Sequence, residues 1–219
     1  MSLLLYGVAE AGGAPASGVG LDHKPLRTIV EGPLAAIVSD HSSADPEPAG
    51  ERLRDYELTV RRLMERDAIL PVRFGSVLAD EGAARALLRR RRRDLLSRVR
   101  RVRGAVELAL RASWRRDADG GPGVRPPAGT SYLRERLERR QSARRVATEL
   151  DPLSALALWS RRTVAPEPDL PVLDAYLVER GRVAEFVALV GQLGDYLDEV
   201  DLTCTGPWPP YSFAVGAPV

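Results

Sequence analysis

Cysteine, lysine and histidine are all scarce in this sequence of 219 residues. Its one cysteine, Cys204, cannot form an internal disulfide, which fits a reducing compartment such as the cytoplasm. Its two histidines, His23 and His41, have no zinc-binding spacing to one another or to that cysteine. Metal chemistry would therefore depend on carboxylates, and we expect neither a metal site nor a cofactor.

Several longer signals are missing as well. No window approaches 18 uninterrupted apolar residues, and the first residues lack a basic segment followed by a cleavage site. The phosphate-binding pattern G-x-x-x-x-G-K-[ST] is absent, and the glycines of residues 11–20 lie in a low-complexity stretch. These absences predict no membrane span, no export signal and no nucleotide hydrolysis.

Charge is unevenly distributed, although the net charge is only +2. Arg85 to Arg103 contains ten arginines and one acid, whereas residues 165–219 have a local charge of −7. Clustered arginines can bind phosphates, but no aromatic residues interleave to stack on bases. A solvated helix face, or one that docks on an acidic protein surface, is the favoured interpretation, and a nucleic-acid-binding or regulatory protein acting through helix 80–103 is the alternative.

The first half of the sequence predicts a mixed α+β domain over residues 1–103. Pro71 has no N–H, so the strand-like stretch 68–75 should lie at a sheet edge, at a bulge or at a strand start. Asp80 is an expected N-cap. The expected elements are strands at 3–8, 26–30 and 34–38, the last two forming a hairpin, a helix through Leu53 to Met64, and a helix from Asp80 to about Arg103.

The second half predicts a ferredoxin-like βαββαβ unit over residues 104–206, in an α+β protein of two domains. A helix capped by Thr130 or Ser131 should follow a mobile loop at 115–129 and end at Asp151-Pro152. The remaining expected elements are strands at 105–112, 153–164 and 172–178, a proline-rich turn at 165–171, a helix at 182–197 and a half-buried strand at 200–205.

Few residues of the sequence suggest a catalytic site. Cys204 lies on the apolar phase of the last strand, where a buried hydrophobe is the usual role. His41 precedes two serines, but sequence adjacency is not triad geometry, so we interpret it as a turn residue. An enzyme that uses a ferredoxin-like scaffold remains a third hypothesis, because that fold hosts many chemistries.

Two stretches of the sequence carry a more specific signal than composition does. They are Ala68-Ile69-Leu70-Pro71-Val72-Arg73-Phe74-Gly75-Ser76-Val77 and Leu202-Thr203-Cys204-Thr205-Gly206-Pro207-Trp208-Pro209-Pro210-Tyr211-Ser212-Phe213. Both resemble signatures of the gas vesicle protein L/F family (GvpL/GvpF), and Leu3–Val8, residues 36–41 and residues 175–178 also fit it. The resemblance spans the chain, although Cys204 departs from the pattern. Its motif residues, expected to be structural or partner-binding, are Pro71, Arg73, Phe74, Gly75, Gly206, Pro207, Trp208, Pro209, Pro210, Tyr211 and Phe213.

The resemblance implies a non-enzymatic accessory protein of gas vesicle formation with no catalytic residues. It implies two α+β domains, the second a modified ferredoxin-like unit, in a minor component associated with the vesicle wall and present in the cytoplasm. The implied partners are the small main shell protein, whose premature aggregation it would limit or whose assembly into the wall it would nucleate, and other gas vesicle accessory proteins.

The tail at 207–219 is unusually stiff and aromatic. Three prolines within Thr205–Phe213 remove N–H donors, so this segment should not extend a sheet as an ordinary strand. Exposed Trp208, Tyr211 and Phe213 would be a liability in a soluble protein, so we expect them to fold back over the protein as a clasp. Direct binding of the shell protein by the tail is the alternative.

Overall fold

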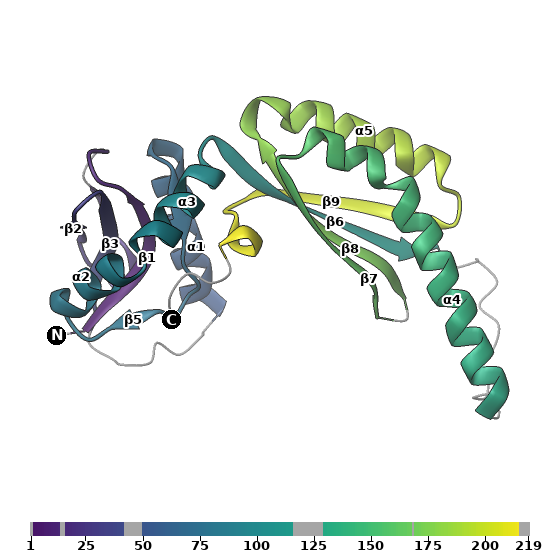
Figure 1. The fold of residues 1–219 in the computed structure, drawn as a ribbon, viewed down its shortest axis with the longest axis horizontal. Helices are drawn as coiled ribbons and strands as arrows, with labels where there is room; N and C mark the ends of the chain where they lie inside the picture. Colours follow the sequence, from purple (N-terminus) through teal and green to yellow (C-terminus); the bar gives the residue numbers. More distant parts are fainter. Residues whose placement is uncertain (1, 14–15, 42–49, 116–128, 168, 215–219) are drawn as a thin grey trace. The chain divides into compact units, whose positions relative to one another are not determined.

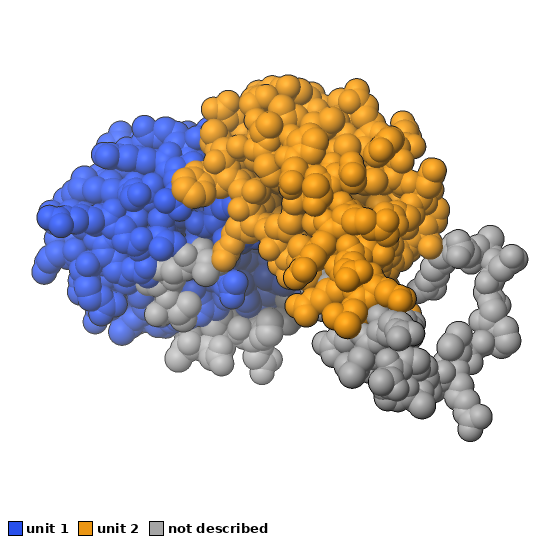
Figure 2. Space-filling model, turned by 45° about the vertical axis from the view of Figure 1, so that its right-hand side comes forward, with its two compact units in different colours: residues 1–105, 208–219 blue, residues 106–207 orange. Residues whose placement is uncertain are grey.

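The computed structural model describes residues 2–13, 16–41, 50–115, 129–167 and 169–214, and it confirms the α+β class. The chain separates into two compact units, one formed by residues 1–105 with 208–219 and the other by residues 106–207 (Figure 2). Each unit has its own sheet and its own apolar core. Residues 208–214 thus return to the first unit.

The first unit is built on a sheet with the strand order β2-β3-β1-β4, in which β5 also pairs with β1. Its strands are β1 (Ser2–Glu10), β2 (Leu26–Glu31), β3 (Leu34–His41), β4 (Ile69–Pro71) and β5 (Val77–Leu78). The expected hairpin is confirmed: β2 and β3 are antiparallel, and Gly32 in their turn has a φ of +58°, which glycine adopts without strain. The strand that contains Pro71 lies at the sheet edge, one of the placements that its missing N–H allows. The strand is shorter than the expected stretch 68–75, because β4 ends at Pro71.

Strand β1 is buried along both faces because helices cover both sides of this sheet (Figure 1). The helices are α1 (Gly50–Arg66), α2 (Glu81–Arg90) and α3 (Arg92–Val102). Tyr56, Val60 and Leu63 of α1 pack on Leu4 and Tyr6 of β1. Helices α2 and α3 cover the opposite face, so the apolar run at the start of the chain forms the centre of the unit.

The single helix expected from Asp80 to Arg103 is wrong, because the structure interrupts it at Arg91. The backbone of Arg91 has φ −107° and ψ 18°, outside helical geometry. The break allows α2 to pack on β2 and β3 while α3 packs on β1 and β4. The helix start is confirmed: the Asp80 side chain accepts a hydrogen bond of 2.8 Å from the Ala83 N–H.

The second unit has the element order β-α-β-β-α-β and the strand order β7-β8-β6-β9, which is compatible with a ferredoxin-like sheet. Its elements are β6 (Ala105–Trp114), α4 (Gly129–Glu149), β7 (Trp159–Glu167), β8 (Leu170–Glu179), α5 (Val183–Tyr196) and β9 (Val200–Trp208). Helices α4 and α5 lie on one face of the sheet (Figure 1), and Val146, Tyr176, Phe186 and Val190 contribute to the core between them.

Three expectations for this unit are wrong in detail. Residues 151–156 form a 3-10 helix rather than the start of a strand, because Pro152 sits in its first turn, and β7 begins only at Trp159. The proline-rich stretch is not a long turn, because β7 continues to Glu167, which pairs with Leu170. Pro166 is tolerated in β7, an edge strand, and Pro171 is the second residue of β8. Thr130 and Ser131 lie inside α4, which begins at Gly129, rather than before it.

Most of the expected loop at 115–129 lies outside the described residues. The helix expected at 182–197 is confirmed as α5, which begins one residue later and ends one residue earlier. Strand β9 has the alternation predicted for it, with Val200 buried, Leu202 and Cys204 half-buried, and Thr203 exposed. The sheet of the second unit therefore follows the local pattern of its sequence, apart from where its strands begin.

Candidate functional site

The two sequence motifs meet around one buried ring, Tyr56, in the first unit. The Tyr56 ring stacks on Tyr6 with centroids 5.0 Å apart and meets the edge of Phe74 at 5.3 Å. Tyr211, from the end of the chain, packs against the same cluster. Segments far apart in the sequence thus supply one aromatic cluster, which we call the Tyr56 cluster: Tyr6, Tyr56, Phe74 and Tyr211.

The hydroxyl of Tyr56 links β1 to the segment that follows β4. The hydroxyl oxygen lies 2.8 Å from the carbonyl oxygen of Leu5 and 2.7 Å from that of Val72, so both carbonyls are placed to accept its one proton. Burial raises the pKa of Tyr56 well above its usual value, so the hydroxyl keeps its proton. The Tyr6 hydroxyl in turn accepts from the Leu21 N–H at 2.7 Å. Neither tyrosine was among the expected site residues, although each lies among apolar residues of its element. That position was the available signal, since buried tyrosines need a polar partner.

The first motif shapes a turn beside this cluster. Pro71 ends β4 and is buried opposite Gly7. Gly75 has a φ of +86°, a conformation that side chains rarely adopt, and it lies between β4 and β5. The Arg73 side chain is exposed, while its carbonyl accepts a 2.9 Å hydrogen bond from the Ser76 hydroxyl. Phe74 is the one aromatic residue of this motif in the Tyr56 cluster, and Ile69 and Val77 of the same motif pack in the surrounding apolar core.

The second motif continues a strand before it packs on the first unit. Contrary to expectation, β9 extends through Gly206 and Pro207 to Trp208, because it is an edge strand in which missing donors are tolerated. The guanidinium carbon of Arg61 then lies 4.3 Å from the Trp208 ring centre, a cation–π contact. Pro209, Pro210 and Phe213 are buried. These contacts place residues 208–214 against the first unit.

The Tyr211 hydroxyl offers a direct test of this packing. It is buried and has no hydrogen-bond partner among the described residues, and burial raises its pKa. An unsatisfied buried hydroxyl lowers stability, so Tyr211→Phe is expected to raise the free energy of unfolding by about 1 kcal/mol. Urea unfolding followed by circular dichroism measures this change in the free energy of unfolding. A loss of stability instead would show that the hydroxyl makes a necessary polar contact.

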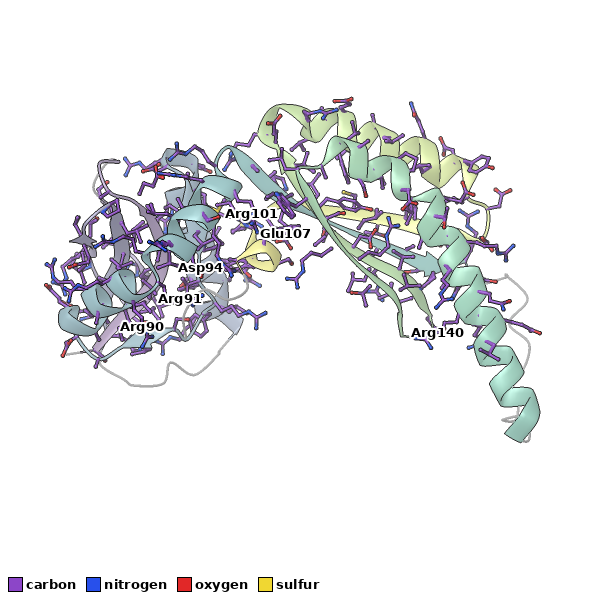
Figure 3. The ribbon with its side chains drawn as sticks, viewed as in Figure 1. Arg90, Arg91, Asp94, Arg101, Glu107 and Arg140 are labelled. Atoms are coloured by element: carbon purple, nitrogen blue, oxygen red, sulfur yellow. The ribbon has the colours of Figure 1, made fainter. Side chains whose placement is uncertain are left out.

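Several arginines of α2, α3 and their flanks form ion pairs with acids of the first unit, and Figure 3 labels Arg91 and Asp94 of this stretch. The Arg89 Nε lies 3.0 Å from Glu31, and the Arg100 Nε lies 2.7 Å from Glu10. Arg91 and Arg98 both reach Asp94 at 2.6 Å. Hydrogen bonds from these arginines lower the pKa values of Glu10 and Glu31. The acidic surface that these helices meet therefore includes the ends of β1 and β2.

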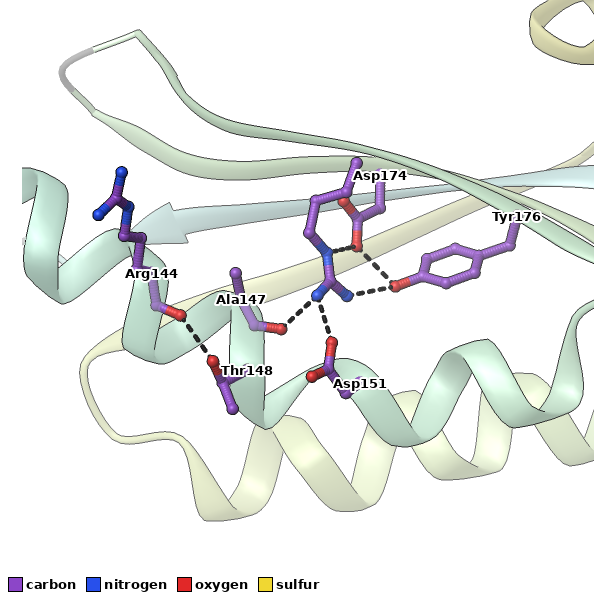
Figure 4. Close-up of polar contacts among 7 residues, drawn as sticks. Arg144, Ala147, Thr148, Asp151, Asp174 and Tyr176 are labelled. Atoms are coloured by element: carbon purple, nitrogen blue, oxygen red, sulfur yellow. Dashed lines mark hydrogen bonds and ion pairs between the residues drawn. The ribbon is translucent and has the colours of Figure 1, made fainter.

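The second unit contains a polar network around the buried carboxylate of Asp174 that the sequence did not lead us to expect (Figure 4). Arg162 of β7 donates to Asp174 of β8 at 2.9 Å, to Asp151 at 2.5 Å and to the carbonyl oxygen of Ala147 at 2.6 Å. The Tyr176 hydroxyl donates to Asp174 at 2.6 Å. Asp174 is 1% exposed, and burial raises its pKa. The network joins the end of α4 to the sheet through one guanidinium.

The remaining candidate groups give no support for catalysis. Cys204 is half-buried and burial raises its pKa, which favours the unreactive thiol. His41 is not a turn residue as expected; it ends β3 and is buried, and burial lowers its pKa. In the described part of the chain, no three His, Cys, Asp or Glu side chains gather as metal ligands, and no helix is long and apolar enough to cross a membrane.

Comparison with known proteins places this arrangement in a family. The family described as "Gas vesicle synthesis protein GvpL/GvpF" matches residues 2–215. Gas vesicle protein F of Streptomyces sp. (strain CB03234) is 29% identical over 97% of this chain and 99% of the relative. Gas vesicle protein L of the same strain is 28% identical over 91% of this chain and 87% of the relative.

Two crystal structures share the fold. GvpF from Anabaena sp. PCC7120 has a TM-score of 0.79 at 20% identity, covering 97% of this chain and 95% of that one. GvpF from Microcystis aeruginosa has a TM-score of 0.76 at 19% identity, covering 97% and 98%. The expected resemblance is confirmed along nearly the whole length, and the chain belongs to the gas vesicle protein GvpL/GvpF family.

Proposed function

We propose that this protein is a non-enzymatic assembly factor that binds the main gas vesicle shell protein. It limits the aggregation of that subunit or nucleates its assembly, and it is a minor component associated with the vesicle wall as well as present in the cytoplasm. Membership of the family over residues 2–215 is the observation that carries the proposal. Other gas vesicle accessory proteins are further partners under this proposal.

The physical chemistry of a gas-filled shell supports this role. A subunit that faces gas needs a very apolar surface, which is prone to aggregate before assembly. A partner must therefore offer apolar contact area of its own. The second unit exposes large apolar side chains in both of its layers: Trp159 and Leu173 on the sheet, and Val187 and Tyr196 on α5.

The nucleic-acid alternative is weakened by the ion pairs of α2 and α3. Arg89, Arg91, Arg98, Arg100 and Arg103 each contact a carboxylate of the first unit, so their charge is partly neutralised within the molecule. Counterion release on binding phosphates requires unneutralised cations. The enzyme hypothesis is weakened in a similar way, because the buried carboxylate of Asp174 is held by Arg162 and Tyr176.

Co-expression with the shell protein tests the proposal. The shell protein should co-purify with the tagged chain, and its soluble fraction should rise, because its apolar surface is covered before it can self-associate. An unrelated protein of similar mass and arginine content is the control. Absence of co-purification together with an unchanged soluble fraction would contradict the proposal.

A further inference from the structure

The first unit contains a cavity with a volume of about 200 Å³ between its sheet and the end of α1. Its floor is one row of cross-strand neighbours on β2, β3, β1 and β4, namely Val30, Ala35, Ala9 and Ile69. Leu63, near the end of α1, lines the opposite side. All of these side chains except Val30 are buried, so the cavity extends from the surface into the apolar core of the unit.

Small residues create this space. Ala9 and Ala35 are direct neighbours in the middle of the row, where longer side chains would fill it. Gly12 and Gly13 also line the cavity, and a Cβ atom on Gly13 would lie 1.8 Å from a carboxylate oxygen of Asp67. Folded proteins contain few voids larger than a water molecule, because a void forfeits contacts and lowers stability. A cavity of this size is therefore a candidate binding site.

The polar side chains that line the cavity lie at its rim and are engaged there. Each of the four bonds another group of the first unit: Thr28 accepts from the Ala16 N–H at 3.0 Å, Asp67 accepts from the Ala68 N–H at 2.7 Å, Arg66 donates to the Ser17 hydroxyl at 2.5 Å, and Glu10 accepts from Arg100 at 2.7 Å. None of the four is buried, whereas the interior is lined by aliphatic side chains. A water molecule or a polar solute would give up hydrogen bonds on entering. The cavity therefore selects an apolar group.

We propose that this cavity binds one large apolar side chain of the main shell protein. An apolar cavity of about 150 Å³ is sufficient for benzene, so one of about 200 Å³ accommodates the side chain of leucine, isoleucine, methionine or phenylalanine. The preference for a compact apolar group follows from the size and lining of the cavity. The identity of the occupant rests on the proposed function, which this inference deepens by naming the site.

The mouth of the cavity suits a group that is attached to a partner. Val30 is 45% exposed there, and Gly12 and Gly13 are exposed as well. Because these glycines have no side chains, a partner backbone can approach closely while its side chain enters. Single large side chains that fill pockets commonly dominate the binding energy of an interface. The subunit of a gas-filled shell supplies such side chains on its apolar surface.

A second copy of this chain supplies poorer occupants. Among the residues that the structure describes, its two most exposed large apolar side chains are Tyr196 at 71% and Leu137 at 61%. The Tyr196 hydroxyl would enter first and lose its hydrogen bonds to water. Leu137 lies on α4 one turn before Arg140. The charges at and beside the rim are basic on balance, with Arg66, Arg100 and Arg103 against Glu10 and Asp67. The arginine-rich helix α4 would therefore meet charge of its own sign.

Benzene binding tests the cavity by itself, without the shell protein. Benzene in about tenfold excess over its Kd should raise the melting temperature of the wild-type chain by roughly 4 °C. Ala35→Ile fills the centre of the floor, so this variant should fold and show no shift. Thr203→Ile also places an isoleucine in a strand, but at an exposed position of β9 in the second unit. This matched control should respond to benzene as the wild type does.

A second variant covers the case in which Ala35→Ile does not fold. Ala9→Val fills the neighbouring position of the floor and should abolish most of the shift. Amide NMR shifts on adding benzene to the wild type should centre on Ala9, Ala35 and Leu63, which line the cavity. No benzene-induced change in the wild type, or an equal change in the filled variants, would overturn the site.

Co-purification of the shell protein with the tagged full chain then identifies the occupant. Ala35→Ile should recover about tenfold less shell protein than the wild type, because the apolar side chain can no longer enter. Thr203→Ile should recover as much as the wild type. If Ala35→Ile loses benzene binding but recovers the shell protein equally well, the proposed function stands. The assigned occupant is then wrong, and the cavity takes a free apolar molecule.

The remaining outcomes are also decisive. If the wild-type chain recovers no shell protein, the proposed function and the occupant are both wrong, whereas the benzene result still decides whether the cavity is a site. If sedimentation shows that Ala35→Ile dissociates copies of this chain while recovery of the shell protein is unchanged, the occupant is a second copy and the inference is overturned.

Discussion

Phe213→Ala is expected to lower the free energy of unfolding of the first unit by about 3–5 kcal/mol, although the residue lies only six positions before the last one. Its side chain is 8% exposed, in a segment that belongs to the first unit. Removing a buried phenyl ring loses its transfer free energy and leaves a cavity. Urea unfolding monitored by circular dichroism, with the two units followed as separate transitions where they resolve, measures the change.

Tyr211→Phe is the matched control, because it changes a neighbouring aromatic side chain but removes only an unpartnered hydroxyl. A destabilised Phe213→Ala protein beside a stable Tyr211→Phe protein would establish the tail as a clasp. Unchanged melting of Phe213→Ala combined with lost binding of the shell protein would instead make the tail a binding element. Trp208→Ala should change the free energy of unfolding by an amount between those of Phe213→Ala and Tyr211→Phe. Trp208 is half-buried, and its contact with Arg61 is worth about 1 kcal/mol.

The sequence predicted best those elements whose signals lie within a few neighbouring residues. The hairpin needed only two β-type runs and the Glu31-Gly32-Pro33 turn, and the start of α2 needed only a capping aspartate at Asp80. The break at Arg91 could not be predicted in this way. It depends on how the two halves of the helix meet different strands, and no glycine or proline marks it.

The Tyr56 cluster shows a different limit. Phe74 and Tyr211 belong to motifs that were recognised, but nothing local indicates that they contact the same ring. The contact depends on the chain returning to the first unit after completing the second. Trp208 meeting Arg61 is a similar case, because 147 positions separate the two residues in the sequence.

The polar network of the second unit had a signal that strand periodicity could have revealed. Arg162 lies on the inward phase of β7, between exposed Arg161 and Thr163, and Asp174 shares its phase with buried Val172 and Tyr176. Opposite charges on the buried phases of paired strands predict a buried ion pair. The sequence analysis expected that strand to start at Leu153, and this early start obscured the alternation.

Arg162→Met is expected to lower the free energy of unfolding of the second unit by about 3–5 kcal/mol. The substitution leaves the carboxylate of Asp174 buried without its cation, and one of its oxygens, Oδ1, already has no partner. It also removes the donor to the Ala147 carbonyl and to Asp151. The double variant Arg162→Met/Asp174→Leu is the control, and it should recover most of the loss because no buried charge remains.

The pH dependence of the stability lost on Arg162→Met distinguishes a lost ion pair from lost packing. Burial raises the pKa of Asp174, so the folded state binds more protons than the unfolded state from the ordinary aspartate pKa up to the raised one. Stability therefore falls as the pH rises through that window. Loss of Arg162 raises the pKa further, so the deficit of Arg162→Met should shrink from pH 7 toward pH 5. When Asp174 is replaced by Asn, the stability lost on Arg162→Met should not depend on pH. If the protein that retains Asp174 loses the same stability at pH 7 and at pH 5, the effect of Arg162 is due to packing alone.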